Sequence, residues 1–576
     1  MKKRLLCFAL AILMLCSVFL TSCSDNRTDE QIIKDIVGNT AKVPLTFNIM
    51  IPTDANPSSP EFQERLAAVE EAINVRLRKE MCAQIKIIAV NDGEYDTVLA
   101  NKMNELKNKE SNKDYRKPSS LVGHEDYPEY KTTAGRVENG TIQLLYPKVR
   151  DTQLDIILIR SKEDYVKYYS KGQLSSWKTD LTTSNYNQIN KTIRSEILDA
   201  LKVKTGNSYE IYGIPNNHLF SDGEYKYMLI DKSVASFVPD FDINSITNDN
   251  GDVDYVELEK FVNSVTSVSN TIPFSATLDD APLTYWGNED DFSLVGSGVN
   301  GGAPTDTLGN IDYVTFMKLY KTYGEASETD KKIAVSYIEC DYTEIKDYEE
   351  DYYVIKTKVP VLSEESIFDS VFAVTDYSIE YERAKDIVYN LQTDAEIRTL
   401  LQYGIKDDDY EINEDGVLEM IKDNQGKYAY KMNSLYTGNG YLTYVAEGVS
   451  MDYWTDVKKV NYDSITDPYA GFDAYYNKLS KKGEYNTKIA ALNTLNDSVY
   501  DTIEDMSAEE FATFAAEWSN AQTTNEAVLA IKNSAAYKDA MEVYTTVYTS
   551  YTTAKALPED EPVEPSEPTE PGEPTE

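Results

Sequence analysis

The sequence predicts an α/β protein with two lobes and a helical C-terminal region, and three observations support this prediction. Strand-like and helix-like segments alternate from residue 44 to residue 170, which is typical of a largely parallel sheet covered by helices. The chain has 576 residues, and about five hundred remain without its two atypical ends, too many for one compact core. Beyond residue 475 the pattern is almost entirely helical.

The N-terminal segment is typical of a secreted lipoprotein. A basic start, KKR, precedes an apolar stretch from Leu5 to Leu20. This stretch ends in Leu-Thr-Ser-Cys, which resembles the lipobox of bacterial lipoproteins, where the cysteine becomes the first mature residue and carries a diacylglycerol. An ordinary secretory signal with a chance cysteine is the alternative. We expect a signal peptide over residues 1–22, a lipid anchor on Cys23, a polar tether over 23–43, and a position on the extracellular face of the cell membrane.

The C-terminal end and the overall charge limit the possible partners. Residues 558–576 alternate proline with glutamate and contain nothing that could start a core, so a disordered acidic tail is predicted. The formal net charge is −41, and loss of the three basic residues of the signal brings the mature chain to about −44. Such a surface repels phosphate backbones, so nucleic acid is a poor partner.

The first lobe begins with elements that its periodicity defines. After the strand PLTFNIMIP, a helix carries apolar residues at spacings of three and four: Phe62, Leu66, Val69, Ile73, Leu77 and Met81. The strand QIKIIAV and a helix over 94–106 repeat the pattern, and LDIILIR is continuously apolar, as expected for a strand buried on both faces. Residues 107–148 are polar and interrupted, which predicts a surface insertion with a hairpin at Asn139-Gly140.

The rest of the chain supplies the second lobe and the crossings between lobes. YEIYGIP and YKYMLIDK are predicted strands, and helices are expected over 255–268 and 312–323. KKIAVSYIEC and DYYVIKTKVPV are predicted to pair with each other, and SIFDSVFAVTD to lead from a strand into the helix IEYERAKDIVYNLQTD. We predict one lobe from 44–160 with about 300–360, and the other from 161–299 with about 361–557.

The motifs of common enzymes and metal sites are missing from the sequence. With only His124 and His218, the chain can hardly build a histidine metal site or relay, and it contains no H-E-x-x-H, G-x-S-x-G or P-loop. We therefore predict no enzymatic activity, no metal and no cofactor. The segment ITNDNGDVDYVELE has the spacing of an EF-hand loop, but Ile246 stands at the first ligand position. An Asn-Gly turn before a helix is the favoured interpretation, and calcium binding is the alternative.

Besides the predicted lipidation site Cys23, two cysteines remain after the signal is removed. Cys82 ends a helical pattern and Cys340 lies in a strand pattern. Two buried free thiols are the simpler interpretation, and one long-range disulfide is the alternative, which the sequence cannot decide.

Several segments together resemble one protein family. LDIILIRSKEDYVKYYSKGQLSSWKTDL, YGIPNN with YKYMLIDKSV, and SVFAVTDYSIEYERAKDIVYNLQTDAEIRTLLQYGI are similar, in this order, to segments of the extracellular sugar-binding proteins of bacterial ABC importers, the maltose-binding-protein-like branch. The resemblance extends over about residues 44–556, while the insertion and the acidic tail depart from the family's pattern. It implies a type II periplasmic-binding-protein-like fold, whose two lobes are joined by crossing strands and close on a ligand in the cleft between them.

The resemblance gives functional meaning to the sequence IYGIPNNHLF. Strands that cross between lobes end at the cleft, proline fixes the backbone there, and an amide can both donate and accept. Asn216 and Asn217 are therefore candidates for reading sugar hydroxyls. Capping of a turn is the alternative role for both residues.

Further ligand-binding candidates come from aromatic and polar residues in loops. Trp286 is the first candidate for stacking on a sugar ring and Trp454 the second, whereas Trp177 and Trp518 lie on helical patterns and are expected in the core. The remaining candidates are polar: three follow the first strand, at the end where open α/β sheets bind ligands, and two lie in loops, which gives Thr53, Asp54, Asn56, Asn288 and Asn300.

The function predicted from these observations is capture of a solute, most consistent with an oligosaccharide, and its delivery to the permease of an ABC transporter by a lipid-anchored monomer. A binder of peptides or of another polar solute on the same fold is the alternative. A surface glycoside hydrolase would require two carboxylates at catalytic distance. An adhesin or structural lipoprotein would not close on a ligand.

Overall fold

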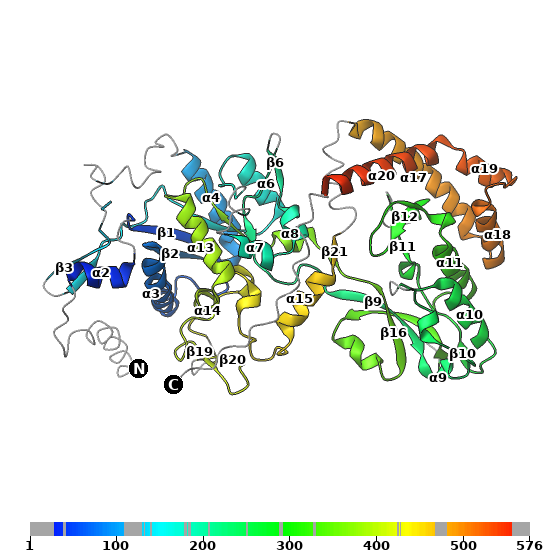
Figure 1. The fold of residues 1–576 in the computed structure, drawn as a ribbon, viewed down its shortest axis with the longest axis horizontal. Helices are drawn as coiled ribbons and strands as arrows, with labels where there is room; N and C mark the ends of the chain where they lie inside the picture. Colours follow the sequence, from blue (N-terminus) through cyan, green and yellow to red (C-terminus); the bar gives the residue numbers. More distant parts are fainter. Residues whose placement is uncertain are drawn as a thin grey trace. The chain divides into compact units, whose positions relative to one another are not determined.

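The structure is a computed structural model that describes residues 28–38, 42–108, 122, 130–131, 133–138, 141–177, 181, 186–205, 208–248, 252–286, 292–326, 330–422, 426, 428–466 and 481–555. The chain divides into two compact units (Figure 1). Unit 1 comprises Met1–Ile193, Leu201–Asn217 and Phe368–Met451, and unit 2 comprises Arg194–Ala200, His218–Ile367 and Asp452–Glu576. The predicted signal peptide and acidic tail lie outside the described residues.

The predicted two-lobed α/β class is confirmed, but the assignment of segments to lobes is corrected. Residues 300–360, predicted in the first lobe, belong to unit 2, and residues 368–451 return to unit 1. The reason is strand pairing, because β18 (Val371–Val374) joins the sheet of unit 1 beside β5 (Ile156–Ile159). The predicted strand YEIYGIP ends at Pro215, just before the Asn217–His218 boundary, and the predicted strand DYYVIKTKVPV ends at Val361, several residues before the Ile367–Phe368 boundary.

The core of unit 1 is a five-stranded sheet in the order β2-β1-β5-β18-β8. The strands β1 (Leu45–Thr53), β2 (Ala83–Asn91) and β5 are parallel, and β18 is antiparallel to both β5 and β8 (Ile214–Pro215). All nine residues of β1 are buried, as are the four of β5. The predicted largely parallel sheet is therefore confirmed, and its continuous apolar strands are those with neighbours on both edges.

The helices of unit 1 bury the faces that the sequence predicts. The six apolar residues of α3 (Pro60–Met81) that define its predicted stripe are all buried, and the helix packs on β2. Ser59 caps its first turn through a 3.1 Å hydrogen bond from the Phe62 N–H. The other helices of this unit are α2 (Asp29–Val37), α4 (Tyr95–Asn108), α6 (Lys162–Ser170), α7 (Asn187–Thr192), α13 (Tyr381–Thr393) and α14 (Ala395–Tyr403).

The predicted tether is corrected, because part of it is a helix that packs on unit 1. Thr28 forms a capping box at the start of α2, and Val37 at its end is fully buried in a cluster with Cys82 and Ala134. Gly38 then turns the chain with φ of 62°, where an added Cβ would lie 1.7 Å from the Lys79 carbonyl oxygen. Apolar residues spaced four apart lie on one face of α2, and this face packs against unit 1.

The predicted hairpin of the insertion is confirmed by β3 (Gly135–Glu138) and β4 (Thr141–Leu144), which pair antiparallel on either side of the predicted Asn-Gly turn. The turn residues themselves lie outside the described residues. The remaining paired strands of unit 1 are β6 (Val203–Thr205) with β7 (Ser208–Glu210) and β19 (Tyr410–Ile412) with β20 (Leu418–Met420).

Unit 2 contains an antiparallel sheet in the order β15-β9-β16, from Val335–Asp341, Glu224–Asp231 and Tyr352–Lys358. The prediction that the two outer strands pair with each other is wrong, because both pair with β9. Alternate residues of β9 enter two different apolar clusters: Tyr225, Tyr227 and Leu229 enter one, and Met228 and Ile230 enter the other. A strand that is buried on both faces takes the central position.

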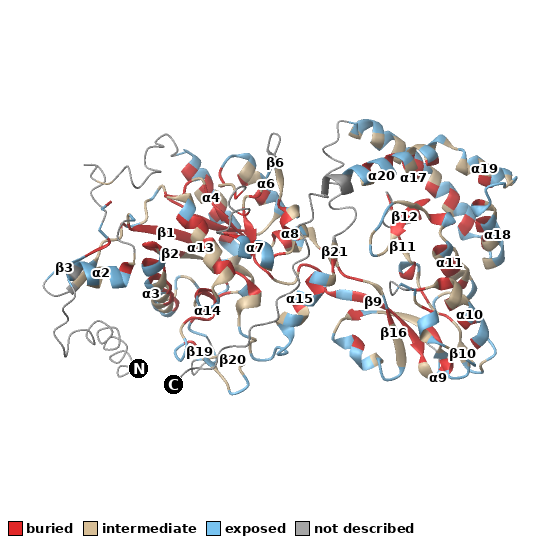
Figure 2. Cartoon of the chain, viewed as in Figure 1, coloured by how far each residue is buried: buried red, intermediate tan, exposed pale blue. Residues whose placement is uncertain are grey.

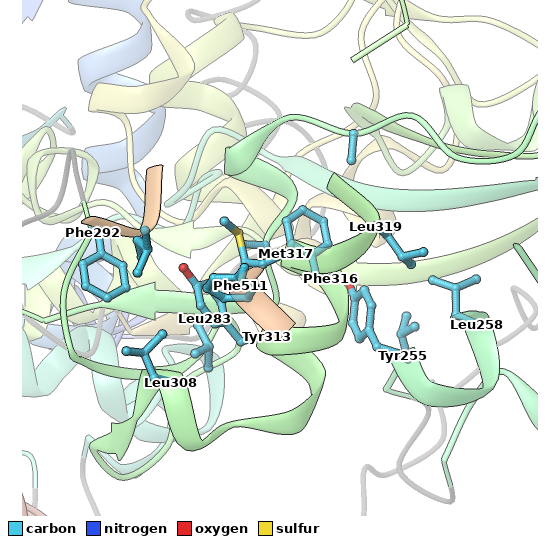
Figure 3. Close-up of a cluster of buried hydrophobic side chains, with 14 of the residues drawn as sticks. Tyr255, Leu258, Leu283, Phe292, Leu308, Tyr313, Phe316, Met317, Leu319 and Phe511 are labelled. Atoms are coloured by element: carbon cyan, nitrogen blue, oxygen red, sulfur yellow. The ribbon is translucent and has the colours of Figure 1, made fainter. Parts of the chain in front are cut away.

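The large core of unit 2 combines residues that are distant in the sequence. Figure 3 shows Tyr255, Leu258, Phe316 and Leu319 packed in a cluster that also contains Phe511 from the C-terminal helices. The predicted helical C-terminal region is confirmed by α17 (Lys482–Glu504), α18 (Ala508–Ser519), α19 (Glu526–Lys532) and α20 (Ala535–Lys555). In Figure 2 the outer faces of these helices are exposed and their inner faces buried.

Smaller elements complete unit 2. A three-stranded sheet orders β11 (Leu283–Tyr285), β12 (Val295–Gly298) and β13 (Thr305–Asp306), and the helices of the middle segment include α10 (Tyr255–Val265) and α11 (Ile311–Tyr323). The other elements are α8 (Ser195–Ala200), α9 (Lys232–Ala235), β10 (Thr271–Ile272), β14 (Lys332–Ile333), β17 (Val361–Leu362), α15 (Tyr453–Asp463) and β21 (Ile465–Thr466), with α12 (Glu364–Phe368) at the boundary between units.

Cys82 and Cys340 are both buried and free, as the simpler interpretation predicted. In the described part of the chain, no helix is both long enough and apolar enough to cross a membrane.

Candidate functional site

One edge of the unit 1 sheet collects the ends of its strands. Thr53 pairs with Asn91 at the carboxyl ends of β1 and β2, while Val371 at the start of β18 pairs with Ile159 and Pro215 at the carboxyl ends of β5 and β8. Residues that directly follow these strands therefore lie along a single edge. Ligands of open α/β sheets bind at this edge, because the loops there can present side chains without disturbing the strands.

The residue that follows β5 is the centre of a charged cluster. The Arg160 guanidinium donates from Nη1 to Asp92 Oδ1 at 2.5 Å and from Nη2 to Asp96 Oδ2 at 2.6 Å. Asp92 lies in the turn that follows β2, and Asp96 lies in the first turn of α4. Nη1 also lies 3.3 Å from the hydroxyl of Tyr436. Two carboxylates thus hold the cation in one orientation.

Two aromatic rings make cation–π contacts with the same guanidinium group. Its central carbon is 5.2 Å from the ring centroid of Tyr95 and 5.5 Å from that of Tyr436. Tyr95 is fully buried, and its hydroxyl accepts from the Leu158 N–H at 3.0 Å, so it fixes Arg160 to the sheet. Tyr436 is only half-buried, so it can present part of its ring and its hydroxyl to a ligand.

The electrostatics of the cluster bring one predicted residue into it. Burial raises the pKa of Tyr436, the neighbouring Arg160 lowers it, and the negative charges of Asp92 and Asp54 raise it. Burial opposes the charge of Arg160, but hydrogen bonds with Asp96 and Tyr436 outweigh it and raise the pKa of the guanidinium. We call Asp54, Asp92, Asp96, Arg160 and Tyr436 the edge cluster.

The edge cluster combines the groups that recognise polyhydroxylated ligands. Carboxylates accept hydrogen bonds from hydroxyls, and an aromatic ring covers the apolar C–H face. The Arg160 guanidinium holds these groups in place, because all five of its N–H groups donate to Asp92, Asp96 or Tyr436. The cluster contains no nucleophile next to a base in the part of the chain that the structure describes, and the same part contains no group of three or more His, Cys, Asp or Glu arranged to hold a metal ion. Binding through hydrogen bonds and stacking is the chemistry that this arrangement supports.

The loop that carries Tyr436 is fixed from below by backbone and amide hydrogen bonds. The Leu435 carbonyl oxygen accepts from Asn216 Nδ2 at 2.9 Å, and the Gly440 N–H donates to the Asn217 carbonyl oxygen at 2.9 Å. Asn439 Nδ2 donates to the carbonyl oxygen of Gln392 on α13 at 3.0 Å. The loop is therefore a rigid support for the ring.

Asn216 and Asn217 contribute to the site indirectly in this structure. Asn216 is fully buried, and its amide donates to Ser370 Oγ at 2.7 Å and to Leu435, while its Oδ1 accepts from Gln392 Nε2 at 2.6 Å. Asn217 is 2% exposed and donates to the Thr192 carbonyl oxygen at 3.1 Å. The Asn216 amide ties β8 to the Tyr436 loop, and the Asn217 amide ties the chain just after β8 to the end of α7. Both are structural roles, close to the turn-capping alternative.

The three candidates after β1 differ in exposure. Thr53 is buried, and its hydroxyl accepts from the Ala55 N–H at 3.1 Å. Asn56 is exposed and accepts from the Ser58 N–H at 3.0 Å, which shapes the turn. Asp54 is exposed, and its negative charge helps to raise the pKa of Tyr436, which is the observation that links it to the edge cluster.

The aromatic candidates lie in unit 2, and the first of them is corrected. Trp286 is fully buried, and its ring lies 5.2 Å from that of Tyr544 on α20, so it is a core residue without a free face for stacking. The loop that suggested exposure is covered by the C-terminal helix. Trp454 is partly exposed and packs edge-on against Tyr453 with centroids 4.9 Å apart. Trp177 and Trp518 are fully buried, as predicted.

The other polar candidates also belong to unit 2. Asn300 is exposed, and its amide bridges to β16 by donating to the Thr357 carbonyl oxygen at 3.3 Å and accepting from the Val359 N–H at 3.1 Å. Asn288 lies outside the described residues, as does the predicted lipidation site Cys23.

The EF-hand-like segment is closed by its own hydrogen bonds where the structure describes it. Asn248 Oδ1 accepts from the Asp252 N–H at 3.0 Å, and Asp254 caps α10 by accepting from the Val256 and Glu257 N–H groups. These contacts match the turn before a helix that the sequence favours, while residues 249–251 lie outside the described part.

Sequence reasoning missed most of the edge cluster. Arg160, Asp92 and Tyr436 were not among the predicted residues, although two of them directly follow strands that the sequence identified. A charged residue immediately after a continuous apolar strand is the signal that could have indicated Arg160. Nothing near Tyr436 in the sequence distinguishes it from the other 43 tyrosines.

Comparisons with known proteins give structural similarity only. No protein-family model matches the chain, and no curated protein matches it. Among solved structures, the chain is similar to the N-glycan transport solute-binding protein of Streptococcus pneumoniae, with 14% identity and a TM-score of 0.40 over 89% of this chain and 100% of that chain. The chain is also similar to an extracellular solute-binding protein of Bifidobacterium longum subsp. infantis, with 12% identity and a TM-score of 0.35 over 88% of this chain and 99% of that chain.

A third similar structure is an ABC substrate-binding protein of Listeria monocytogenes in complex with cycloalternan, with 9% identity and a TM-score of 0.25 over 82% of this chain and 97% of that chain. All three are solute-binding proteins, but TM-scores of this size are too low to transfer a residue role or a ligand to this chain.

Proposed function

We propose that this chain is a solute-binding protein that captures an oligosaccharide and delivers it to the permease of an ABC transporter. The observation that carries the proposal is the edge cluster, in which a doubly paired guanidinium, exposed carboxylates and a half-buried tyrosine gather at the carboxyl edge of a parallel sheet. The order of the family-like segments along the chain gives separate support from the sequence.

The anchoring part of the proposal rests on the sequence. Cys23 becomes the first mature residue, carries lipid and places the protein on the outer face of the cell membrane as a monomer. Mass spectrometry of the native protein tests this directly, because an unmodified cysteine or a different N-terminus would contradict it.

The test of binding begins with a thermal-shift screen of the chain without its signal and Cys23, against oligosaccharides and peptides. We expect an oligosaccharide to raise the melting temperature, because a ligand that binds only the native state stabilises it. Stabilisation by peptides alone would favour the alternative polar-solute binder. Release of new reducing ends from a bound glycan would indicate a glycoside hydrolase instead.

The residue-level test uses calorimetric titration with the oligosaccharide found in the screen. Tyr436→Ala and Arg160→Ala should each weaken binding by about 1–3 kcal/mol, the range of interface residues that dominate affinity. The matched control is Arg136→Ala, an exposed arginine of the β3–β4 hairpin whose side chain is 57% exposed. Equal affinity of all three variants and the wild type would exclude the edge cluster as the site.

A further inference from the structure

Unit 2 contains a pocket of about 250 Å³ that the edge cluster does not include. Its walls come from β9 and β16, from Asn248, Asp252 and Val253, from the loops around residues 279–283 and 298–301, and from the start of α11. This volume is slightly below the usual range of about 300–1,000 Å³ for sites that hold drug-sized ligands. The pocket therefore fits a compact ligand of about one ring.

The base of the pocket is held by buried charges that are already paired. Lys226 and Asp280 form an ion pair at 3.0 Å, with side chains only 11% and 8% exposed. Lys226 also donates to the Asp279 carbonyl oxygen at 3.0 Å, and Asp280 Oδ2 accepts from the Thr277 N–H at 2.7 Å. The amide of Asn300 ties the 298–301 loop to β16. These bonds fix the shape of the pocket before any ligand arrives.

Other polar groups of the lining remain available. In the described part of the chain, no residue forms an ion pair or a side-chain hydrogen bond with the ammonium of Lys358 or the carboxylate of Asp279, although both residues line the pocket. Asn310 uses its Oδ1 to cap α11 at 3.0 Å, and its Nδ2 has no partner among the same residues. The pocket thus offers a cation, an amide donor and a carboxylate.

Asp312 adds a second carboxylate, and its surroundings disfavour the charged form of this group. Burial raises its pKa, the backbone N–H of Tyr255 lowers it, and the charges of Asp254 and Asp252 raise it further. A ligand hydroxyl that donates to this carboxylate would stabilise its charge. The apolar residues Val253, Leu283 and Val299 also line the pocket.

We propose that this pocket binds one neutral sugar ring, with Asp279 and Asp312 accepting from its hydroxyls and Lys358 donating to a hydroxyl or ring oxygen. Several hydroxyls on a compact ring match the several separate donors and acceptors of the lining and its apolar residues, whereas a short peptide presents one charge at each of its two ends. The inference rests on the proposed function and assigns to unit 2 a sugar subsite that the sequence indicated only through Asn300.

The experiment uses the full chain in detergent and compares Lys358→Met and Asp312→Asn with two matched controls, Lys346→Met and Asp347→Asn. The control residues are adjacent, exposed and outside the pocket of the same unit. Saturation-transfer NMR with D-mannose, D-galactose, N-acetyl-D-glucosamine and glycylglycine tests the pocket itself. Calorimetric titration with an oligosaccharide tests whether the pocket contributes to the affinity for a longer sugar, and melting curves establish that each variant is folded.

We expect at least one of the monosaccharides to receive saturation transfer from the wild type and both controls but not from the two pocket variants. The Kd for the oligosaccharide should rise at least about tenfold in each pocket variant, since a hydrogen bond to a charged group is lost. If Asp312→Asn does not fold, the result for Lys358→Met decides the test. The side chain of Lys358 lies at the end of a surface strand, so this substitution should not unfold the protein.

The failures of the two proposals are distinguishable. An unchanged oligosaccharide Kd in both pocket variants, with weaker binding by Arg160→Ala, would overturn the pocket and leave the proposed function standing. Binding of glycylglycine with no sugar would overturn both. Monosaccharide transfer that depends on Lys358, without binding of any oligosaccharide, would support the pocket and overturn the proposed function.

Discussion

The interiors of the two units are built from different chemistry. Unit 1 buries a network of carboxylate, amide and guanidinium groups around its sheet, with Asp155, Asn216 and Arg398 all fully buried. Unit 2 buries a large cluster that is mostly aromatic and aliphatic, in which Trp286 and Trp518 are fully buried. Polar bonds are directional and fix the positions of loops, whereas apolar packing mainly fills volume. This difference explains why the rigidly positioned edge cluster belongs to unit 1.

The largest expected effect is in the apolar core of unit 2. Trp286→Ala should lower the free energy of unfolding by about 3–5 kcal/mol, because it leaves a cavity against Tyr544 and Tyr548. Urea denaturation measures the change. Trp454→Ala is the matched control and should cost less than about 1 kcal/mol, since that ring is partly exposed. Normal stability with lost sugar binding in Trp286→Ala would restore its predicted stacking role.

The second effect tests the polar interior of unit 1 through pH. Asp155 accepts from the N–H groups of Asn48 and Ile379, both at 2.8 Å, and from the side chains of Ser378 and Gln153. Burial nevertheless raises its pKa to about 6, because these donors only partly offset the loss of water.

The sign of the pH dependence follows from the direction of that shift. In the unfolded chain the pKa of an aspartate is about 3.9, so between pH 4 and 6 the folded protein keeps a proton that the unfolded chain has lost. The stabilising contribution of Asp155 is complete below about pH 4 and disappears as the pH rises through about 6. Between pH 4 and 7, the free energy of unfolding of the wild type should fall by roughly 2 kcal/mol relative to that of Asp155→Asn. Parallel stability curves would contradict this.

The third prediction concerns the loop that carries Tyr436. Gly438 has φ of 113°, and an added Cβ would lie 2.2 Å from the Leu391 carbonyl oxygen. Gly438→Ala should therefore lower stability by roughly 1–3 kcal/mol and weaken sugar binding by displacing the ring. Gly416→Ala separates backbone strain from the steric clash of the added Cβ. Gly416 also has a positive φ of 81°, but a Cβ added there would have no atom within 4 Å. Equal effects of the two variants would show that backbone strain alone matters.

The smallest expected effect is at the fully buried Arg398. Its Nη2 donates to the Ser434 carbonyl oxygen at 3.1 Å, but its Nε and Nη1 have no partner among the described residues. Burial lowers the pKa of this guanidinium to about 10, so it is still charged at neutral pH. Arg398→Met should change stability by less than about 1 kcal/mol, because the lost hydrogen bond is offset by removal of a desolvated charge.

The control for Arg398 is Arg383, which is also buried but donates to the carbonyl oxygens of Val43 and Cys82 at 2.8 and 3.1 Å. Arg383→Met should lower the stability of the protein clearly more, as measured by thermal and urea denaturation, because it removes charge-assisted hydrogen bonds that are satisfied. A larger loss for Arg398→Met than for Arg383→Met would mean that the Ser434 contact outweighs the desolvation of the charge.

Elements with a clear period were predictable from the sequence. The apolar stripe of α3, the continuous strands β1 and β5, and the helices after residue 481 all appear where the pattern placed them. Burial selects apolar residues at a fixed spacing, so the spacing identifies the element. The grouping of segments was less predictable, because β18 joins β5 through hydrogen bonds between backbones more than two hundred residues apart.

The sequence by itself determined the α/β class, most helices and strands, and the position of Asp54 after the first strand. Only the tertiary structure decided that Asn216 and Asn217 are internal supports, that Trp286 is covered by α20, and that Arg160 and Tyr436 meet. Local periodicity reports whether a residue faces an interior, but it does not report which distant segment covers it. A binding site consists of such distant contacts, and they exist only when the chain is folded.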